Sequence, residues 1–141
     1  MALVVATRMK PSSPRHVPAF VVSSFRAASQ ARHSPGFLGG HLRIAGALEF
    51  WTLTMWEDRH HMAAYRDGGF HGRIMPSMRR WAKEAASAAW LWDDEEPPSW
   101  QEARKRITSE RAYFIEVERP TADHAAARIR PTRRRGLIAT L

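Results

Sequence analysis

The sequence predicts an α+β fold in which helices cover one face of a β-sheet. Two observations lead to this prediction. Residues 48–56 alternate with large apolar side chains on both faces, which is typical of a central strand covered on both sides. Residues 17–31 instead place apolar side chains at helical spacing, which predicts an amphipathic helix. The 141 residues, of which 44% are hydrophobic and 26% charged, are enough to bury one core.

The first half of the chain supplies a strand, a helix and a pair of strands. Residues 3–9 form a short apolar run that predicts the first strand. The helix over residues 17–31 ends at the turn residues 34–36. Residues 37–44 alternate and predict the second strand, and a turn connects them to the third strand at residues 48–56.

The second half repeats the helical and strand patterns. A helix is predicted from Asp58 to about Tyr65, and a second helical stretch follows over residues 74–85, with a kink or a fresh start at Pro76. Residues 88–92 predict the fourth strand. The order β-α-β-β-α-β is the ferredoxin-like arrangement. The sheet face opposite the helices then needs a cover, and a second copy packed sheet to sheet would supply it in a symmetric homodimer.

Composition shifts divide the chain into three parts. Residues 1–98 hold the ferredoxin-like α/β-barrel domain and end in an acidic, proline-rich linker. Residues 99–119 predict an appendage with a short helix, capped by Ser99, and a strand. Residues 120–141 form a basic tail in which we predict no regular structure.

Charge and cysteine content exclude several classes of protein. The net charge is +8, and most of the excess lies beyond residue 103. A solvated tail explains this charge more simply than contact with nucleic acid or an anionic membrane, because no nucleic-acid-binding motif accompanies it. The absence of cysteine excludes disulfide scaffolds and thiolate chemistry. Apolar runs are too short to span a bilayer, so we expect a cytoplasmic protein.

A run of residues from the third strand onward resembles a known superfamily. These residues are Phe50-Trp-Thr-Leu-Thr-Met-Trp-Glu-Asp58, followed by Met62, Tyr65, Gly68, His71, Met75-Pro76 and Arg80-Trp81. On them, the chain resembles the dimeric α/β-barrel superfamily, and within it the group that contains spheroidene monooxygenase and small relatives of the antibiotic biosynthesis monooxygenase type. The resemblance covers about residues 3–92.

The resemblance implies a homodimeric α/β barrel and an oxygenase-type activity. The superfamily includes quinone-forming monooxygenases that use no cofactor, haem-degrading monooxygenases, and proteins with no assigned reaction, so the fold alone does not fix the activity. We therefore expect a monooxygenase-type enzyme that acts on a hydrophobic small molecule, with haem as the candidate cofactor and none as the alternative.

The expected pocket lies between the helices and the sheet. The candidate substrate-pocket residues are Phe25, Trp51, Leu53, Met55, Met62, Tyr65, Ile74 and Met78. His71 and His41 are the candidate catalytic residues, because a neutral imidazole can act as a general base. His71 also lies where haem-binding relatives carry their axial ligand, so His71, Met75, Arg79 and Trp81 are the candidate cofactor-binding residues, with His71 on the iron.

Two alternatives of another class stay open. The protein could bind haem or a small ligand without catalysis. It could also be a structural dimer whose basic tail meets nucleic acid or a membrane, in which case binding would depend on salt and on the segment after Pro120.

Overall fold

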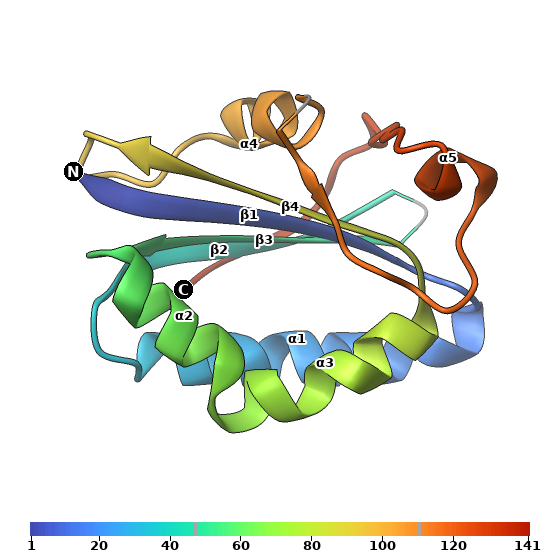
Figure 1. Ribbon diagram of the computed structural model, residues 1–141, viewed down its shortest axis with the longest axis horizontal. Coiled ribbons are helices and arrows are strands. Elements are labelled where there is room, and N and C mark those ends of the chain that lie inside the picture. The colour runs from blue at the N-terminus through green and yellow to red at the C-terminus, as the bar shows by residue number, and fades with distance from the viewer. Residues whose placement is uncertain (47, 110) are drawn as a thin grey trace.

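A six-stranded antiparallel sheet organises the chain, with the strand order β5-β4-β1-β3-β2-β6 (Figure 1). The computed structural model describes residues 1–46, 48–109 and 111–141. The strands are β1 (Ala2–Pro11), β2 (Phe37–Ala45), β3 (Glu49–Trp56), β4 (Ala82–Trp92), β5 (Tyr113–Phe114) and β6 (Gly136–Thr140). The helices are η1 (Pro14–His16), α1 (Val17–Arg32), α2 (Arg59–Asp67), α3 (Gly69–Trp81), α4 (Trp100–Ile107) and α5 (Ala122–Ala125).

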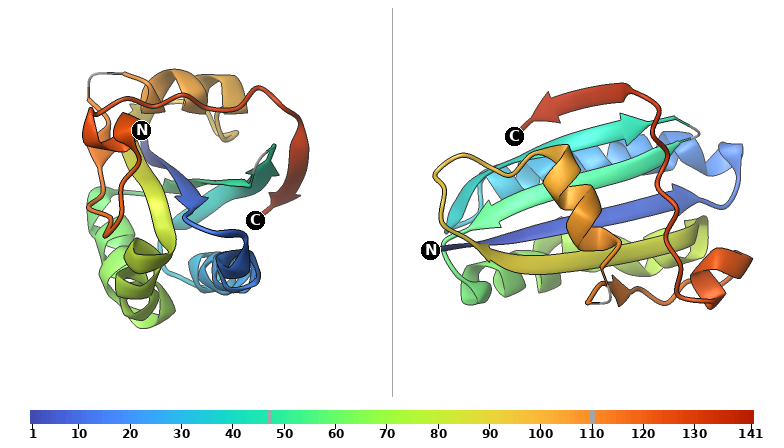
Figure 2. Two further views of the ribbon diagram at one scale, coloured as in Figure 1. Left: turned by 90° about the vertical axis from the view of Figure 1, so that its right-hand side faces the viewer. Right: turned by 90° about the horizontal axis from the view of Figure 1, so that it is seen from above.

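The first four strands and their helices confirm the predicted α+β, ferredoxin-like fold. Strands β1 and β3 are the two central strands, and β4 and β2 flank them. Helices α1, α2 and α3 cover one face of the sheet, whereas α4 lies against the other (Figures 1 and 2). None of the helices in the described parts of the chain is both long enough and apolar enough to cross a membrane.

Strand β4 begins six residues earlier than its sequence predicts. The prediction continued a helix to Ala85 and began the strand at Ala88, because alanine favours helices by intrinsic propensity. In the structure α3 ends at Trp81, and Ala82 already pairs with Pro11. Pairing with a central strand of the sheet overrides the local helix preference here.

The basic tail has regular structure that its sequence did not predict. Residues 120–141 include the helical turn α5 and strand β6, and β6 pairs with the edge strand β2. Between them, residues 126–135, which we call the strap, cross the strands on the α4 side of the sheet (Figure 2). The partners of the strap on the sheet lie more than 80 residues away in the sequence, and its partner on α4 lies 28 residues away, so no local pattern reveals its place.

Three arginines from three different elements hold the strap through its carbonyl groups. Arg8 of β1 donates to the carbonyl of residue 130 at 3.5 Å, Arg104 of α4 to that of residue 132 at 2.6 Å, and Arg43 of β2 to that of residue 134 at 3.1 Å. Every second carbonyl of an extended segment points the same way, which explains the spacing of two residues.

Arg8 also centres a buried ionic cluster. Its guanidinium donates to Glu49 at 2.9 Å and to Glu84 at 2.8 Å, and the three residues are 2%, 2% and 7% exposed. Glu49 further accepts from the Trp51 indole at 3.0 Å and from the backbone N–H of Thr132 at 2.6 Å. The cluster therefore joins the three strands β1, β3 and β4 to the strap.

Glu84 shows that hydrogen bonding outweighs burial within this cluster. Burial raises the pKa of Glu84, but the hydrogen bonds from Arg8 and Thr121 lower it by more than burial raises it. The pKa therefore lies below its ordinary value. The stability that this carboxylate contributes is therefore present above the ordinary pKa of glutamate. It is lost as the pH falls through the lowered pKa of the folded state.

The sheet face that led us to expect a homodimer is buried within one chain. Trp51 and Leu53 of β3 pack on this face together with Ala103 and Ile107 of α4, and all four are at most 2% exposed. The appendage thus provides the cover that a second copy was expected to provide. A homodimer stays a prediction, and it would use another surface of the molecule.

Replacing Glu49 tests the cluster. Glu49→Gln removes one partner of the buried Arg8 charge, and loss of one partner from a buried ion pair costs about 3 kcal/mol or more. We expect the free energy of unfolding, measured by urea denaturation, to fall by about that amount. Glu95→Gln, on the exposed linker, should change it by less than about 0.5 kcal/mol. Equal losses in the two variants would contradict a structural role for the cluster.

Candidate functional site

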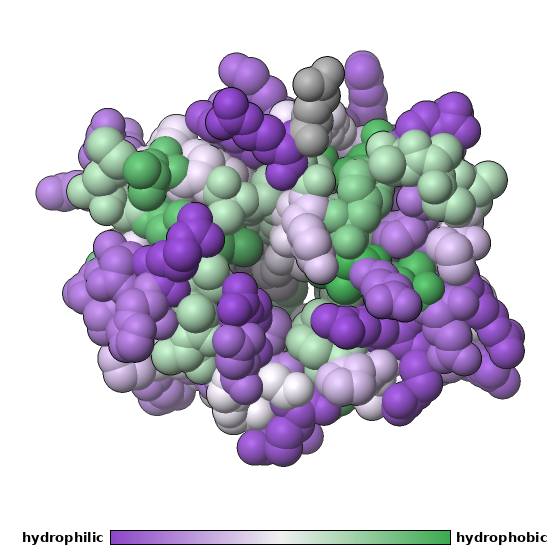
Figure 3. Space-filling view, viewed as in Figure 1, coloured by the Kyte–Doolittle hydropathy of each residue, from purple (hydrophilic) through white to green (hydrophobic). Residues whose placement is uncertain are grey.

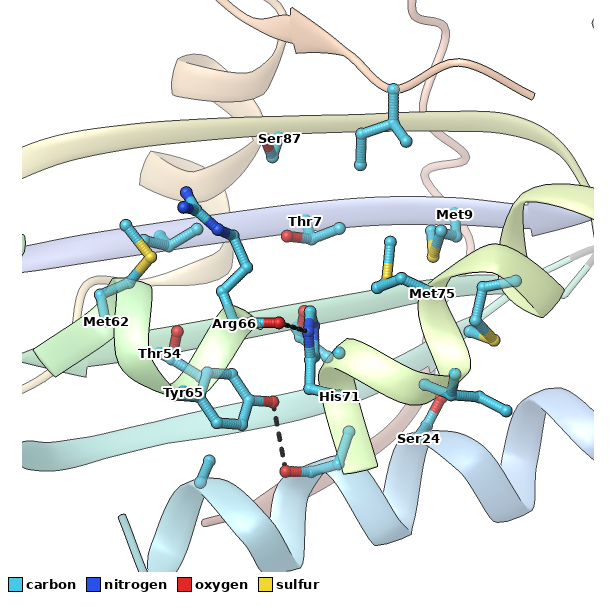
Figure 4. Close-up of a pocket in the computed structure, with 18 of the residues that line it drawn as sticks. Thr7, Met9, Ser24, Thr54, Met62, Tyr65, Arg66, His71, Met75 and Ser87 are labelled. Carbon is cyan, nitrogen blue, oxygen red and sulfur yellow. Dashed lines mark hydrogen bonds between the residues drawn. The ribbon is translucent and has the colours of Figure 1, made fainter. Parts of the chain in front are cut away.

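A cavity of about 780 Å³ lies between the sheet and helices α1, α2 and α3. This volume falls in the range of small-molecule sites. Its walls come from alternate residues of β1 and β3, from residues 87–89 of β4 and from the inner faces of the three helices (Figure 4). In the space-filling view, a hollow lies near the centre of the side that faces the viewer, with hydrophobic and hydrophilic side chains around it (Figure 3).

The sheet wall of the cavity carries a row of hydroxyl groups. Thr7 of β1 is paired in register with Ser87 of β4 on one side and with Thr52 of β3 on the other. Because paired residues of adjacent strands point to the same face, the three hydroxyl side chains stand side by side in the cavity. Thr54 lies two residues further along β3 and also lines it.

The helix wall is largely apolar. Ile74, Met75 and Met78 of α3 line the cavity, at the spacing that places residues on one helix face. Met62 of α2 adds a fourth apolar side chain. Methionine side chains adapt their shape to a ligand more easily than branched ones. A molecule in this cavity therefore meets apolar atoms on one side and hydroxyl groups on the other.

His71 of α3 belongs to the helix wall and has a fixed orientation. Its Nδ1 lies 2.8 Å from the carbonyl oxygen of Arg66, and its ring packs 4.8 Å from that of Tyr65 (Figure 4). A carbonyl oxygen only accepts hydrogen bonds, so Nδ1 carries the proton. In the neutral ring Nε2 then has a free lone pair, and it makes no hydrogen bond with the described residues of the chain.

Burial keeps His71 neutral. It lowers the pKa of His71 below the ordinary 6.5, and the hydrogen bond to the Arg66 carbonyl offsets this only in part. A neutral imidazole with a defined tautomer and an open nitrogen is the form required of a general base or of a metal ligand.

Gln30 of α1 sets the position of His71. Its side-chain amide donates to the carbonyls of Tyr65 and Gly68, both at 3.1 Å, and its oxygen accepts from the backbone N–H of His71 at 2.7 Å. The backbone at Gly69 has a φ of +53°, which favours glycine, and a Cβ there would lie 2.9 Å from the Gln30 nitrogen. The junction of α2 and α3 is therefore shaped around Gln30.

Tyr65 completes an aromatic stack behind His71. Its ring lies 4.9 Å from that of Trp56, and its hydroxyl donates to the carbonyl of Ala27 at 3.2 Å. Burial raises the pKa of Tyr65, so the phenol stays protonated and keeps this hydrogen bond. The stack therefore packs against one side of the imidazole.

Seven of the residues expected at the site line the cavity. They are Met62, Tyr65, His71, Ile74, Met75, Met78 and Arg79. All lie on α2 and α3, where helical periodicity identified the inward face.

Three residues of β3 lie on the opposite face of the sheet from the one expected. Trp51, Leu53 and Met55 pack beneath α4, and their neighbours Phe50, Thr52 and Thr54 line the cavity instead. Successive residues of a strand point to opposite faces, and both faces of β3 carry large side chains, so the pattern did not show which face meets the helices.

The other three expected residues lie outside the cavity as well. His41 of β2 is on the α4 face, with its ring 6.3 Å from that of Trp100. Phe25 is half exposed on the outer side of α1. Trp81 packs against the rings of His16 and Phe20 at the far end of α3.

Several cavity residues escaped sequence analysis because they are polar. Arg59, Arg66 and Arg111 line the cavity, as do the hydroxyl side chains described above and those of Ser23 and Ser24 on α1. Thr52 and Thr54 stand at alternate positions of a strand that is otherwise apolar on both faces. This pattern could have indicated that they line a cavity. The described residues form no cluster of three or more His, Asp or Glu side chains suited to a metal ion.

The sequence matches a family described as "Domain of unknown function (DUF3291)" over residues 1–113. The chain belongs to the DUF3291 family. No curated protein is significantly similar to it in sequence.

Solved structures similar to this DUF3291 protein share its fold. Rv0793 from Mycobacterium tuberculosis has a TM-score of 0.61 and 14% sequence identity, over 67% of this chain and 97% of the other. SnoaB, a cofactor-independent oxygenase from Streptomyces nogalater, has a TM-score of 0.55 and 11% identity, over 66% and 94%. A further structure, described as an antibiotic biosynthesis monooxygenase, has a TM-score of 0.59 and 14% identity, over 65% and 99%.

These likenesses confirm the ferredoxin-like fold that the sequence predicts. They also show which share of this chain lies outside the shared fold. Nearly the whole of each of these three structures corresponds to about two thirds of this chain, so the remaining third has no counterpart in them.

The tautomer and pKa of His71 can be measured directly. We expect ¹H–¹⁵N NMR to find the proton on Nδ1 and a pKa below 6.5, because the carbonyl fixes the tautomer and burial disfavours the charged ring. The unfolded chain then takes up this proton first, so the folded state loses stability as the pH falls below about 6.5. The NMR signals of the His71 ring are assigned as those that disappear in the His71→Asn variant. A pKa above 6.5, or a proton on Nε2 at neutral pH, would contradict this geometry.

Proposed function

We propose that this DUF3291 protein is a monooxygenase that needs no cofactor and oxidises a mostly apolar small molecule in the helix-side cavity. In this proposal His71 is the general base. The observation that supports it most is the fixed, neutral imidazole whose Nε2 is free within a cavity lined by Ile74, Met75 and Met78. The fold shared with SnoaB, a cofactor-independent oxygenase, agrees with the proposal at the level of architecture.

The reaction fits a substrate with an acidic CH₂ group beside an aromatic ring or a carbonyl. Nε2 of His71 takes one proton and leaves a carbanion. The carbanion gives one electron to O₂, and the two radicals combine to form a C–O bond. The resulting peroxide receives the proton back from His71. The O–O bond then breaks with loss of the second C–H proton, which gives a ketone and water.

This sequence balances without any further reductant, because the substrate supplies all the electrons. One CH₂ group and one O₂ become one C=O group and one water. His71 ends in its starting form. The contribution of the protein is to hold the substrate against Nε2, to keep the ring neutral before the reaction, and to limit water around the carbanion.

The hydroxyl row can assist at the other side of the substrate. Thr7, Thr52 and Ser87 offer donors to an oxygen on which charge develops when the proton leaves. The base and the donors lie on opposite walls, so one flat molecule between them can meet both.

A haem-dependent oxygenase is the second candidate. The residues fit a haem in one respect: an imidazole whose Nδ1–H is held by a carbonyl can bind iron through Nε2. Met75 and Arg79 line the same cavity and would contact the macrocycle and a propionate, whereas Trp81 lies elsewhere. A bound haem would supply oxygen chemistry at its iron. A protein that only binds its ligand is the third candidate.

Oxygen uptake with anthrone as the test substrate separates the three. We expect the purified protein, without added cofactor and with chelator present, to convert anthrone to anthraquinone with one O₂ consumed per product. His71→Ala should lower the rate by about 10²-fold or more, as expected for loss of a general base. Phe25→Ala, on the outer side of α1, is the matched control and should leave the rate unchanged.

The other outcomes are equally specific. Turnover that requires haemin and follows a Soret shift lost in His71→Ala would favour the haem-dependent candidate. Tight binding of anthrone with no oxygen uptake in either condition would favour the binding protein and reject both enzymes.

A further inference from the structure

We propose that the cavity takes an anionic molecule, an apolar acid whose carboxylate pairs with an arginine of its wall. This inference rests on the proposed function for the chemistry at His71, but the binding it describes does not depend on turnover. It names the class of ligand that the proposed function leaves open.

The charges that line the cavity are mostly positive. Four arginines and one aspartate contribute, which gives a net charge of +3 with the histidine neutral. The aspartate, Asp67, is already paired, because Arg66 donates to its two oxygens at 2.8 and 3.1 Å. In the described parts of the chain, Arg59, Arg79 and Arg111 form no ion pair.

The arginines line the cavity from separate elements and at different points along its length, since Arg59 begins α2 and Arg79 lies in the last turn of α3. Arg59 and Arg66 are seven residues apart on α2 and so share one helix face. Arg79 comes from the last turn of α3, whose other two arginines, Arg73 and Arg80, do not line the cavity. Arg111 follows α4. A charged helix face alone would not bring side chains from α2, α3 and the appendage to one cavity.

The rest of the wall restricts the ligand to a mostly apolar body. Ile74, Met75 and Met78 offer no hydrogen bonds, and the hydroxyl row opposite them accommodates only a few polar atoms. A highly charged ligand such as a nucleotide would leave most of its polar groups without partners here. An apolar molecule with one acidic group can pack against the apolar wall and pair with an arginine.

Arginine favours a carboxylate at such a site. Its planar guanidinium offers two parallel N–H donors that match the two oxygens of a carboxylate. The side chains of Arg59 and Arg79 are exposed and unpaired within the described chain, so binding a carboxylate breaks no existing ion pair.

A matched pair of probes tests the charge requirement. We would titrate the full chain with 2-naphthoate and with 2-acetonaphthone, its uncharged counterpart, by isothermal calorimetry. The acid should bind about tenfold more tightly than the ketone, as expected for one charge-assisted interaction. Raising the salt concentration should weaken the binding of the acid and leave the binding of the ketone unchanged.

A matched pair of double variants tests the residues. Arg59→Gln with Arg79→Gln should remove the preference for naphthoate and leave the affinity for the ketone unchanged. Arg73→Gln with Arg80→Gln removes the same charge outside the cavity and should keep the preference. The four side chains are exposed, so all variants should fold, and their urea unfolding curves check this.

Two results would overturn the proposal: equal affinity for the two probes, or equal loss of the preference in the two double variants. His71→Ala separates this proposal from the proposed function. It should keep the preference for naphthoate while losing anthrone oxidation. Oxidation of anthrone with no preference for the acid would reject the anionic ligand alone, and the reverse pattern would reject the oxygenase alone.

Discussion

The buried guanidinium of Arg8 is the interaction on which the arrangement of the chain depends. It joins Glu49 and Glu84 across the three neighbouring strands β1, β3 and β4, and it reaches the strap. A charge so deeply buried is tolerated only when its hydrogen bonds are satisfied, so the strands and the strap must be in place together. The cluster closes the α4 face of the sheet, and the ligand cavity lies on the helix side.

The two faces of the sheet therefore have different roles. On the α4 face, tightly packed aromatic and aliphatic side chains and the ionic cluster provide stability. On the helix face, β1, β3 and β4 present hydroxyl groups, and α2 and α3 bring the histidine, the methionines and the arginines. Both sets come from the same strands by alternation, so each strand serves the core and the cavity at once.

The fold and the α3 part of the site could be predicted because their signals are local. Helical spacing identified the inward face of α2 and α3, and His71 stands on it. The face of β3 could not be decided, since Trp51 and Thr52 fit a covered face equally well and only the packing of α4 separates them. The strap escaped prediction because its stability comes from arginines and Glu49, which lie far from it in sequence. Arg59, Arg66 and Arg111 were not predicted, because the fold decides which side chains of separate elements line one cavity.

The central claim is that Nε2 of His71 removes a proton from the bound substrate before oxygen reacts. Mixing the protein with anthrone without oxygen tests it most directly, because the anthrone anion has its own absorption spectrum. The anion should accumulate on the wild-type protein at neutral pH, disappear when O₂ is admitted, and fail to form on His71→Ala. An anion that forms equally on His71→Ala, or no anion on a wild-type protein that still oxidises anthrone, would contradict the claim.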